Sequence, residues 1–276
     1  MDRQAVKPPF AYYGGKMALA KTIARLLPDH DHYVEPFAGS LAVLLAKRPS
    51  RAETVNDLDG DLVTFWRVLR DQPAELTRSA LLTPHSRSEF AEAWSDSPDD
   101  IERARRVWVR LTQSRGHSLS KTGWKFSRRI DSGHASQRLL TFAERLPSAA
   151  ERLRGVSLEC RDALDVIRDY GSESTVCIYA DPPYVGSTRA ANYGIEMTSD
   201  AQHEAFAQVC HDAKATVVIS GYESGLYEQL FDGWSTMTLD APTTLSGDTD
   251  RKEILWSNRP IAEPDLFDVL LEGATA

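Results

Sequence analysis

The 276-residue chain contains few cysteines and no long apolar segment. Cys160, Cys177 and Cys210 form no C-x-x-C pair, which excludes a disulfide-rich framework and favours a reducing compartment. No run of about 18 apolar residues is present, which excludes a transmembrane helix. The first residues, MDRQAVKPPF, lack the apolar core of a signal peptide. We therefore expect a cytoplasmic protein without a membrane partner.

Several catalytic patterns are also missing. The segment F-A-Y-Y-G-G-K at residues 10–16 resembles a phosphate-binding loop, but Phe10 and Met17 stand where that loop requires Gly and Ser or Thr. The G-x-S-x-G pattern of serine hydrolases is absent. His30 and His32 form a close pair without a Cys or H-x-x-E-H partner. We expect neither a nucleoside-triphosphate loop nor a metal ion.

The charge is strongly segregated along the chain. The 32 Lys and Arg residues against 40 Asp and Glu give a net charge of −8, which argues against a polyanionic partner. Residues 101–154, however, carry 13 basic and 4 acidic side chains, a charge of +9, whereas the rest of the chain carries −17. The net charge therefore averages over two very different regions.

The densest basic segment, residues 115–129, mixes Arg and Lys with Gly, Ser and aromatic residues. Such a composition suits a surface that contacts phosphates and stacks on bases. A solvated loop between helices is the alternative, and charge alone does not decide between the two. The candidate residues for contacts with phosphates or bases are Arg128 and Arg129 first, then Lys125 and Trp124, together with Arg115 and Lys121.

Strand and helix patterns alternate along most of the chain. Residues 33–37 and 53–56 are β-rich runs that each precede a helical pattern. The alternation resumes with expected strands at 156–160, 176–180 and 215–220 and expected helices at 163–170, 202–213 and 224–231. Repeated β-α units imply a mainly parallel sheet covered on both faces. The last two strand candidates, residues 234–239 and 253–256, follow one another without a helix. One of them should therefore be antiparallel.

A helical region interrupts this alternation after the second β-α unit. It includes the pattern Ser86-Arg-Ser-Glu89, which is typical of a capping box at a helix start. We therefore expect a catalytic domain at residues 1–72 and 155–262, a basic helical insertion at 73–154 and an acidic tail at 263–276.

Residues that could hold a ligand lie at the ends of the first two predicted strands. Glu35 begins the string E-P-F-A-G, at a strand end where open α/β sheets bind ligands. Asp57 follows the second strand 18 residues after Gly39, close to the spacing at which an acidic side chain binds a ribose hydroxyl. Capping of the helix that contains Leu62 is the structural alternative for Asp57, and both roles can coexist.

The Gly14-Gly15 pair lies upstream of these strands. Two glycines would let the backbone approach a ligand closely, with Lys16 and the neighbouring aromatic residues lining the pocket. A simple turn before a helix at residues 18–27 would fit this string equally well.

The string Tyr179-Ala-Asp181-Pro182-Pro183-Tyr184 is the most informative in the chain. A strand delivers Asp181 to its C-terminal end, and two prolines fix the backbone that follows. The Asp181 carboxylate and the Pro182 carbonyl can accept hydrogen bonds from an aromatic amine, while Tyr184 offers a face for a base. Two such acceptors favour a tetrahedral nitrogen whose lone pair can attack a methyl group. An accidental strand-ending turn is the alternative.

Taken in order, these motifs resemble those of the Dam-type, or D12-class, DNA N6-adenine methyltransferases. The order is F-x-x-x-G-G-K, E-P-F-x-G, an acidic residue after the second strand, a basic insertion and D-P-P-Y. The resemblance covers residues 8–70 and 156–259, where residues 252–258 look like the family's last strand. It implies a class I S-adenosylmethionine-dependent, Rossmann-like α/β fold with a seven-stranded sheet. The insertion would then be a helical target-recognition region that binds double-stranded DNA.

The resemblance also implies residue roles. Asp57 would bind the cofactor ribose and Asp162 would lie near its adenine, while Tyr184 would stack on a flipped base whose N6 attacks the methyl group directly. Leu41 stands where the family often has a second Gly, which predicts a narrower methionine end of the pocket. The S-adenosylmethionine-binding residues would be Tyr12, Tyr13, Gly14, Gly15, Lys16, Glu35, Pro36, Phe37, Gly39, Asp57, Asp162 and Asp181, and the catalytic residues Asp181, Pro182, Pro183 and Tyr184.

Two alternatives stay open. Another planar amine, such as adenine in RNA or a glutamine amide, could be the acceptor, although Asp181 and the basic insertion count against glutamine. The chain could also be a catalytically inactive nucleic-acid-binding protein on the same scaffold, which the retained Lys16, Asp57 and D-P-P-Y disfavour. We expect an active, monomeric, site-specific DNA adenine methyltransferase.

Overall fold

A seven-stranded sheet with the strand order β3-β2-β1-β4-β5-β7-β6 forms the centre of the molecule. The computed structural model describes residues 5–126, 135–183, 197, 199–239 and 252–261. β7 runs antiparallel to both β5 and β6, while the other neighbouring pairs are parallel. The strands are β1 (His32–Glu35), β2 (Ala52–Asn56), β3 (Val156–Glu159), β4 (Val176–Ala180), β5 (Thr216–Tyr222), β6 (Ser235–Leu239) and β7 (Glu253–Ser257). The expected α/β sheet with one antiparallel strand near its end is confirmed, and that strand is β7.

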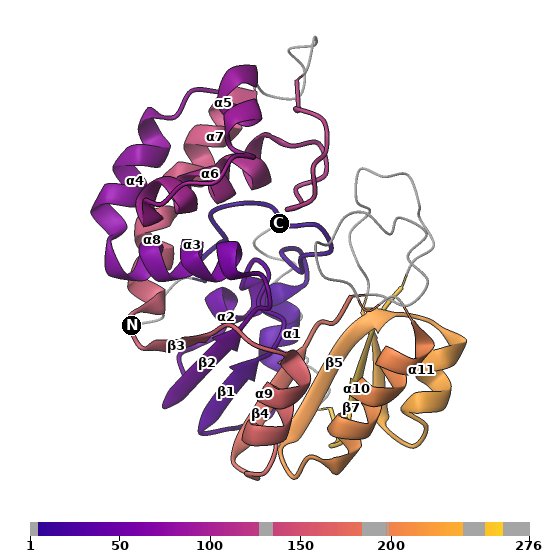
Figure 1. The fold of residues 1–276 in the computed structure, drawn as a ribbon. Coiled ribbons are helices and arrows are strands. Elements are labelled where there is room, and N and C mark those ends of the chain that lie inside the picture. The colour runs from indigo at the N-terminus through magenta and orange to yellow at the C-terminus, as the bar shows by residue number, and fades with distance from the viewer. Residues whose placement is uncertain (1–4, 127–134, 184–196, 198, 240–251, 262–276) are drawn as a thin grey trace, which may run out of the picture.

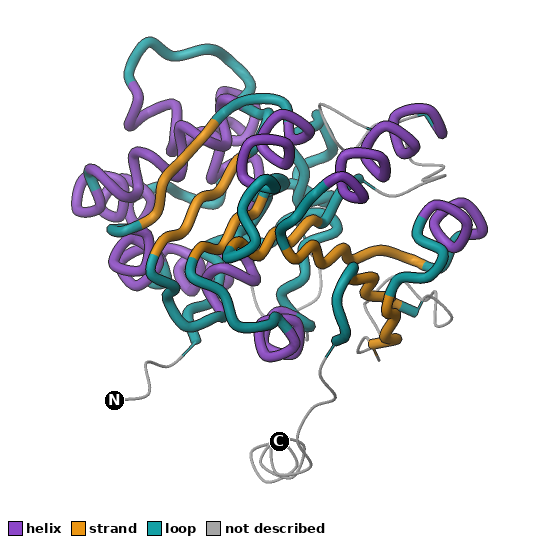
Figure 2. Tube along the Cα trace, turned by 90° about the horizontal axis from the view of Figure 1, so that it is seen from below, coloured by secondary structure: helices purple, strands orange, loops and turns teal. Residues whose placement is uncertain are grey.

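Alternate side chains of the strands enter two separate hydrophobic cores. In β4, Cys177 and Tyr179 face one core, whereas Ile178 and Ala180 face the other, as the two-residue period of a strand requires. Figure 2 shows helices on both sides of the strands. The first core is covered by α1 (Ala20–Leu26), α2 (Ala42–Ala46) and α3 (Gly60–Asp71), and the second by α9 (Ala163–Tyr170), α10 (Asp200–Asp212) and α11 (Gly225–Leu230).

Five helices between α3 and β3 form a layer beside α3 (Figure 1). They are α4 (Pro73–Leu82), α5 (Arg87–Glu92), α6 (Asp100–Gln113), α7 (Ala135–Ala143) and α8 (Leu146–Leu153). The longest of them, α6, has 14 residues. No helix in the described ranges is long and apolar enough to cross a membrane.

The inserted helices share a hydrophobic core with the sheet. Trp108 of α6 is fully buried in the same cluster as Phe65 of α3 and Tyr33 of β1. Its indole Nε1 donates a hydrogen bond to the Pro9 carbonyl, 3.0 Å away. The insertion is therefore packed onto the catalytic sheet as a continuation of one core, while the boundaries at residues 73 and 154 stay a prediction.

The capping box expected before α5 is wrong. Ser86 is the N-cap residue, but its side chain caps no backbone amide and instead bonds to the Ser88 hydroxyl. Glu89 does not reach back to the helix start, because its carboxylate pairs with Arg105 of α6 at 2.6 Å. A tertiary ion pair thus replaces the local motif.

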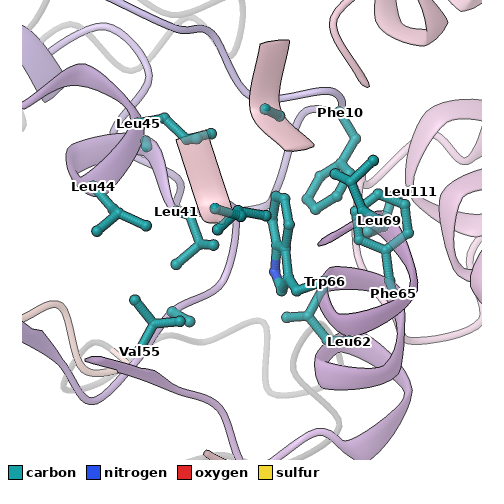
Figure 3. Close-up of a cluster of buried hydrophobic side chains, with 14 of the residues drawn as sticks. Phe10, Leu41, Leu44, Leu45, Val55, Leu62, Phe65, Trp66, Leu69 and Leu111 are labelled. Atoms are coloured by element: carbon teal, nitrogen blue, oxygen red, sulfur yellow. The ribbon is translucent and has the colours of Figure 1, made fainter. Parts of the chain in front are cut away.

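The apolar face of α3 anchors the segment that leads into the first glycine-rich string (Figure 3). Phe10 lies edge-on to Phe65 at a centroid distance of 5.1 Å and is tilted against Trp66 at 5.2 Å. All three rings are buried. Burial of side chains of this size contributes about 2–3 kcal/mol each. The irregular segment before residue 12 is therefore held firmly against α3.

Candidate active site

A cavity of about 430 Å³ opens at the carboxyl ends of β1, β2 and β4. The strand order reverses at β1, which is the place where open α/β sheets bind ligands. All twelve residues expected to bind the cofactor line this cavity, as do Pro182 and Pro183. Tyr184 lies outside the described residues. The lining residues around this set include Ser40, Leu58, Asp59, Leu164, Met197 and Gln202.

The turn after β1 requires glycine at residue 39. Gly39 has a φ of 46°, and a Cβ there would lie 3.2 Å from the Tyr12 ring. Its amide donates to Asp57 Oδ2 at 2.9 Å, and its carbonyl accepts from Trp66 Nε1 at 3.1 Å. The turn is therefore fixed from three sides: by an aromatic ring, by the end of β2 and by α3.

Asp57 holds this turn and does not cap α3. Its two carboxylate oxygens accept hydrogen bonds from the amides of Gly39 and Asp59. The N-cap residue of α3 is Asp59, whose side chain accepts from the Asp61 and Leu62 amides, so the capping role considered for Asp57 is wrong. Burial raises the pKa of Asp57 to about 6, although the hydrogen bonds from the Asp59 and Gly39 amides oppose that rise. Near neutral pH the group is a buried anion that can accept a further hydrogen bond from a ligand.

The backbone conformation at Leu41 is one that glycine adopts more easily than leucine. The residue has a φ of 54° and a ψ of 31°, a left-handed conformation that costs a side-chain-bearing residue about 1–2 kcal/mol. Its side chain is fully buried in the hydrophobic core beside Leu44 and Leu45 (Figure 3) and does not line the cavity. The prediction that Leu41 narrows the methionine end of the cavity is therefore wrong.

A second buried carboxylate, Glu35, lies at the end of β1. Its Oε2 accepts a hydrogen bond from the Tyr33 hydroxyl at 2.9 Å. Burial, opposed by the Tyr33 hydrogen bond and aided by the nearby Asp181, raises the pKa of Glu35 to about 8. Glu35 is therefore largely neutral at pH 7 in the unliganded protein.

Lys16 and Asp181 form the charged centre of the cavity. Lys16 Nζ lies 2.6 Å from Asp181 Oδ1 and 3.4 Å from Glu253 Oε1 of β7. Burial alone would lower the pKa of Lys16, but the two carboxylates raise it above its ordinary value. Lys16 is therefore a permanent cation that faces the D-P-P carboxylate.

Neighbouring hydroxyls fix the orientation of Asp181. The Ser220 hydroxyl of β5 donates to Asp181 Oδ1 at 3.0 Å and is bonded to the Tyr179 hydroxyl at 2.8 Å. Asp181 is therefore held by groups from β4, β5 and residues 12–16, here called the glycine-rich loop. Neither Ser220 nor Glu253 was expected in the site, because their spatial neighbours are far away in the sequence.

Asp162 also lines the cavity and follows β3, which lies three strands from β4 in the sheet. It is the N-cap residue of α9, and its carboxylate accepts from the Leu164 amide at 2.7 Å. Asn56 links this turn to the β1 turn, because its amide nitrogen donates to the Pro36 and Arg161 carbonyls. The described residues contain no group of three His, Cys, Asp or Glu side chains that could hold a metal ion.

Residues 114–126 form a short hairpin, here called the basic hairpin. Ser114 and Trp124 pair as an antiparallel bridge, and the Arg115 and Lys125 amides donate across the hairpin to the Gly123 and Gln113 carbonyls. Arg115 and Lys121 are exposed, whereas Trp124 and Lys125 are half-buried. Arg128 and Arg129 lie outside the described residues.

Trp124 is engaged within the protein. His85 stacks on its ring at 4.6 Å, and the Arg87 guanidinium lies 4.7 Å from the ring centroid. Phe126, 41% exposed, lies near both Arg87 and Arg115. Arg87 was missed from the sequence because it precedes the basic segment by about thirty residues. The exposed ring next to this surface is therefore Phe126 rather than Trp124.

Much of the positive charge of residues 101–154 is neutralised by acidic partners. Arg105 pairs with Glu89 and Glu102, Arg110 and Arg103 pair with Asp61, and Arg152 pairs with the buried Glu53. Three of these acids lie outside the basic region. The charge of +9 counted along the sequence therefore overstates what this surface offers to a polyanion.

Comparisons with known proteins identify the family. A family model described as "D12 class N6 adenine-specific DNA methyltransferase" matches residues 12–245. The chain is 24% identical over 261 residues to the type II methyltransferase M1.LlaDCHI of Lactococcus lactis subsp. cremoris, covering 87% of this chain and 89% of the relative. It is 26% identical over 211 residues to the DNA adenine methylase of Escherichia coli (strain K12), covering 74% of each chain.

Among solved structures, the rRNA methyltransferase aviRa from Streptomyces viridochromogenes is 14% identical, with a TM-score of 0.39, and the match covers 86% of this chain and 81% of that one. The family model spans most of the chain, including the glycine-rich loop, the acidic strand ends, the inserted helices and D-P-P-Y. The chain belongs to the D12 class of N6 adenine-specific DNA methyltransferases.

Proposed function

We propose that this chain uses S-adenosylmethionine to methylate N6 of an adenine that has been flipped out of a specific site in double-stranded DNA. The observation that carries the proposal is the position of Asp181. Its carboxylate lies at the end of β4 in a cavity that also contains Asp57 and Asp162. The same cavity is thus lined by Asp181, which would bind the acceptor amine, and by Asp57 and Asp162, which would bind the adenosine of the cofactor.

The cavity suits the cofactor in size and charge. A volume of about 430 Å³ falls within the range of small-molecule sites, about 300–1,000 Å³. Two backbone amides orient the Asp57 carboxylate, and its remaining lone pairs can accept hydrogen bonds from the ribose hydroxyls. The acidic lining favours a cationic sulfonium, and bound S-adenosylmethionine supplies an electrophilic methyl group.

The chain's own residues orient the acceptor amine. The Asp181 carboxylate and the Pro182 carbonyl accept the two N6 hydrogens, which turns the nitrogen lone pair toward the methyl group. Lys16 and the Ser220 hydroxyl hold the carboxylate in that position. With S-adenosylmethionine bound, methyl transfer would form the N–C bond as the C–S bond breaks and leave S-adenosylhomocysteine, and the amine would then lose one proton to water. Pro183 fixes the backbone after the carbonyl, and Tyr184 stacks on the base.

DNA contacts are assigned to the basic hairpin and the residues that follow it. Arg115 and Lys121 are exposed there, and Arg128 and Arg129 extend the same segment. The half-buried Lys125 belongs to the same hairpin, and the exposed Arg87 lies beside the Phe126 ring of that hairpin. Exposed basic side chains of this kind bind the phosphates of the duplex and orient it.

Methyl transfer from labelled S-adenosylmethionine to unmethylated DNA tests the proposal. We expect label at N6 of adenine with the wild-type chain and at least a 100-fold loss of transfer in Asp181→Ala, with binding of S-adenosylhomocysteine largely kept. Glu204→Ala, a change at an exposed carboxylate of α10, is the matched control and should keep full transfer. Transfer to RNA or to a protein amide but not to DNA would refute the substrate, and no binding of S-adenosylhomocysteine would refute the cofactor.

A further inference from the structure

A main-chain hydrogen bond joins the basic hairpin to the glycine-rich loop. The His117 carbonyl accepts a hydrogen bond from the Tyr13 amide, with an N to O distance of 2.8 Å. Tyr13 and the residues after it line the cavity. A surface that faces DNA and a loop that faces the cofactor are thus joined by a main-chain hydrogen bond.

His117 is held in an unusual backbone conformation. Its φ is 50°, in the left-handed region, which costs a residue other than glycine about 1–3 kcal/mol unless its surroundings maintain it. Strain of this kind marks positions where the backbone must point a group in a required direction. At His117 the group so directed is the carbonyl that binds Tyr13.

The His117 side chain provides the surroundings that maintain this conformation. Nδ1 lies 2.8 Å from the Leu111 carbonyl in the last turns of α6 and donates to it. Nε2 then carries the lone pair and accepts from Lys125 Nζ, 3.0 Å away. The imidazole therefore ties the strained residue to α6 on one side and to a candidate DNA-binding lysine on the other.

Two further contacts hold the chain that leads into the loop. Trp108 Nε1 donates to the Pro9 carbonyl at 3.0 Å, and an Arg145 guanidinium nitrogen donates to the Pro8 carbonyl at 3.1 Å. The inserted helices thus fix residues 8 and 9, whereas His117 contacts Tyr13, which lines the cavity.

We infer that His117 is a positioning residue that couples DNA bound at the basic hairpin to the cofactor loop. This inference rests on the proposed function. A phosphate that engages the hairpin restrains Lys125 and, through it, the imidazole and the carbonyl that holds Tyr13. DNA binding therefore tightens cofactor binding, and the reverse holds by linkage.

Titration calorimetry of S-adenosylhomocysteine, with and without a short mixed-sequence duplex, tests this coupling. We expect the duplex to tighten binding several-fold in the wild-type chain and to have no effect in His117→Ala. That variant should also bind S-adenosylhomocysteine about tenfold more weakly without DNA. His117→Gly adopts the left-handed backbone without strain, so it folds even where alanine does not, and it should lose the coupling too because it lacks the imidazole.

His85→Ala is the matched control. His85 contacts the same hairpin at Trp124 and at the Lys125 carbonyl but not the glycine-rich loop. This variant should lower the melting temperature as His117→Ala does and keep the coupling. Equal loss in both variants, or full coupling in His117→Gly, would overturn the assignment to His117. A wild-type chain that binds no S-adenosylhomocysteine would refute the cofactor instead, and the coupling would fall with it.

Discussion

Lys16 Nζ and Asp181 Oδ1 lie 2.6 Å apart although 165 residues separate them in the chain. The lysine side chain is 5% exposed and the aspartate side chain 19% exposed, so the pair is largely shielded from water. The glycine-rich loop therefore contributes a cation to the D-P-P carboxylate as well as a wall to the cavity.

Removal of Lys16 should destabilise the protein. Lys16→Met leaves Asp181 and Glu253 without the cation between them, and we expect a loss of about 3 kcal/mol in the free energy of unfolding. In urea denaturation, the double variant Lys16→Met, Asp181→Asn should lose clearly less than the sum of the two single variants. Strict additivity would show that the two side chains do not interact energetically.

Glu35 should make stability depend on pH. Its folded-state pKa of about 8 is above the ordinary value of 4.5, so the folded protein holds this proton more tightly than the unfolded chain. The contribution is fully present below about pH 4.5 and is lost as the pH rises to about 8. Its size is on the order of 4 kcal/mol.

Urea denaturation at several pH values measures this term. Glu35→Gln keeps an acceptor for the Tyr33 hydroxyl, so it should fold, and its stability should fall less than that of the wild type between pH 5 and 8. Glu204→Gln, at an exposed site, should follow the wild type. A Glu35→Gln profile parallel to the wild-type profile would contradict the raised pKa.

Protonation of Asp57 should weaken cofactor binding at acidic pH. Its pKa of about 6 means that protonation removes the anionic acceptor as the pH falls below 6. Binding of S-adenosylhomocysteine by the wild type should therefore weaken from pH 7 to pH 5. Asp57→Asn should bind more weakly at pH 7 and show no such fall, and calorimetry at the two pH values distinguishes these outcomes.

The Leu41→Gly variant should be more stable than Leu41→Ala. Leu41→Ala loses packing worth about 2.7–5 kcal/mol and keeps the left-handed strain. Leu41→Gly loses the same packing but relieves about 1–2 kcal/mol of strain. We expect glycine to exceed alanine by about 1 kcal/mol in chemical denaturation, whereas at an ordinary helical position alanine would be more stable.

Exposed and paired basic residues should differ in their effect on DNA binding. Lys121→Ala removes an exposed cation, so the slope of log K against log salt should fall by about 1. Arg105→Ala removes a guanidinium already bonded to Glu89 and Glu102, so it should lower the melting temperature and leave the slope unchanged. Fluorescence anisotropy with a labelled duplex over a salt series measures both.

Local signals made much of the fold predictable. α9 and β4 were expected at their observed bounds, Ala163–Tyr170 and Val176–Ala180, because a capping aspartate precedes the helix and Asp-Pro-Pro ends the strand. The remaining strands were placed to within a few residues. In each case a period of two or 3.6 residues and a clear breaker lie within a short window of sequence.

Long-range partners could not be predicted from the sequence. The spacing from Ser86 to Glu89 predicts a capping box, but Glu89 binds Arg105, which lies 16 residues later in the sequence. Asp57 and Asp59 are both suitable caps, and only the position of Gly39 next to Asp57 separates their roles. The residues around Leu41 give no local sign of its positive φ, and only the glycine that the family often has at this position points to it. These features depend on which helices and strands pack together, and the hydrophobic periodicity of a segment does not encode its partners.

The position of β7 has a consequence for how the enzyme is made. β7 pairs with β5 and β6, and its first residue, Glu253, lies 3.4 Å from Lys16 near the other end of the chain. During synthesis the glycine-rich loop leaves the ribosome more than two hundred residues before the strand that completes its charged centre. A nascent chain can therefore bury most of its first hydrophobic core, all but Val218, Leu239 and Leu255, before it can hold Lys16 next to both carboxylates. Catalytic competence should arise late and abruptly, when the last strand enters the sheet.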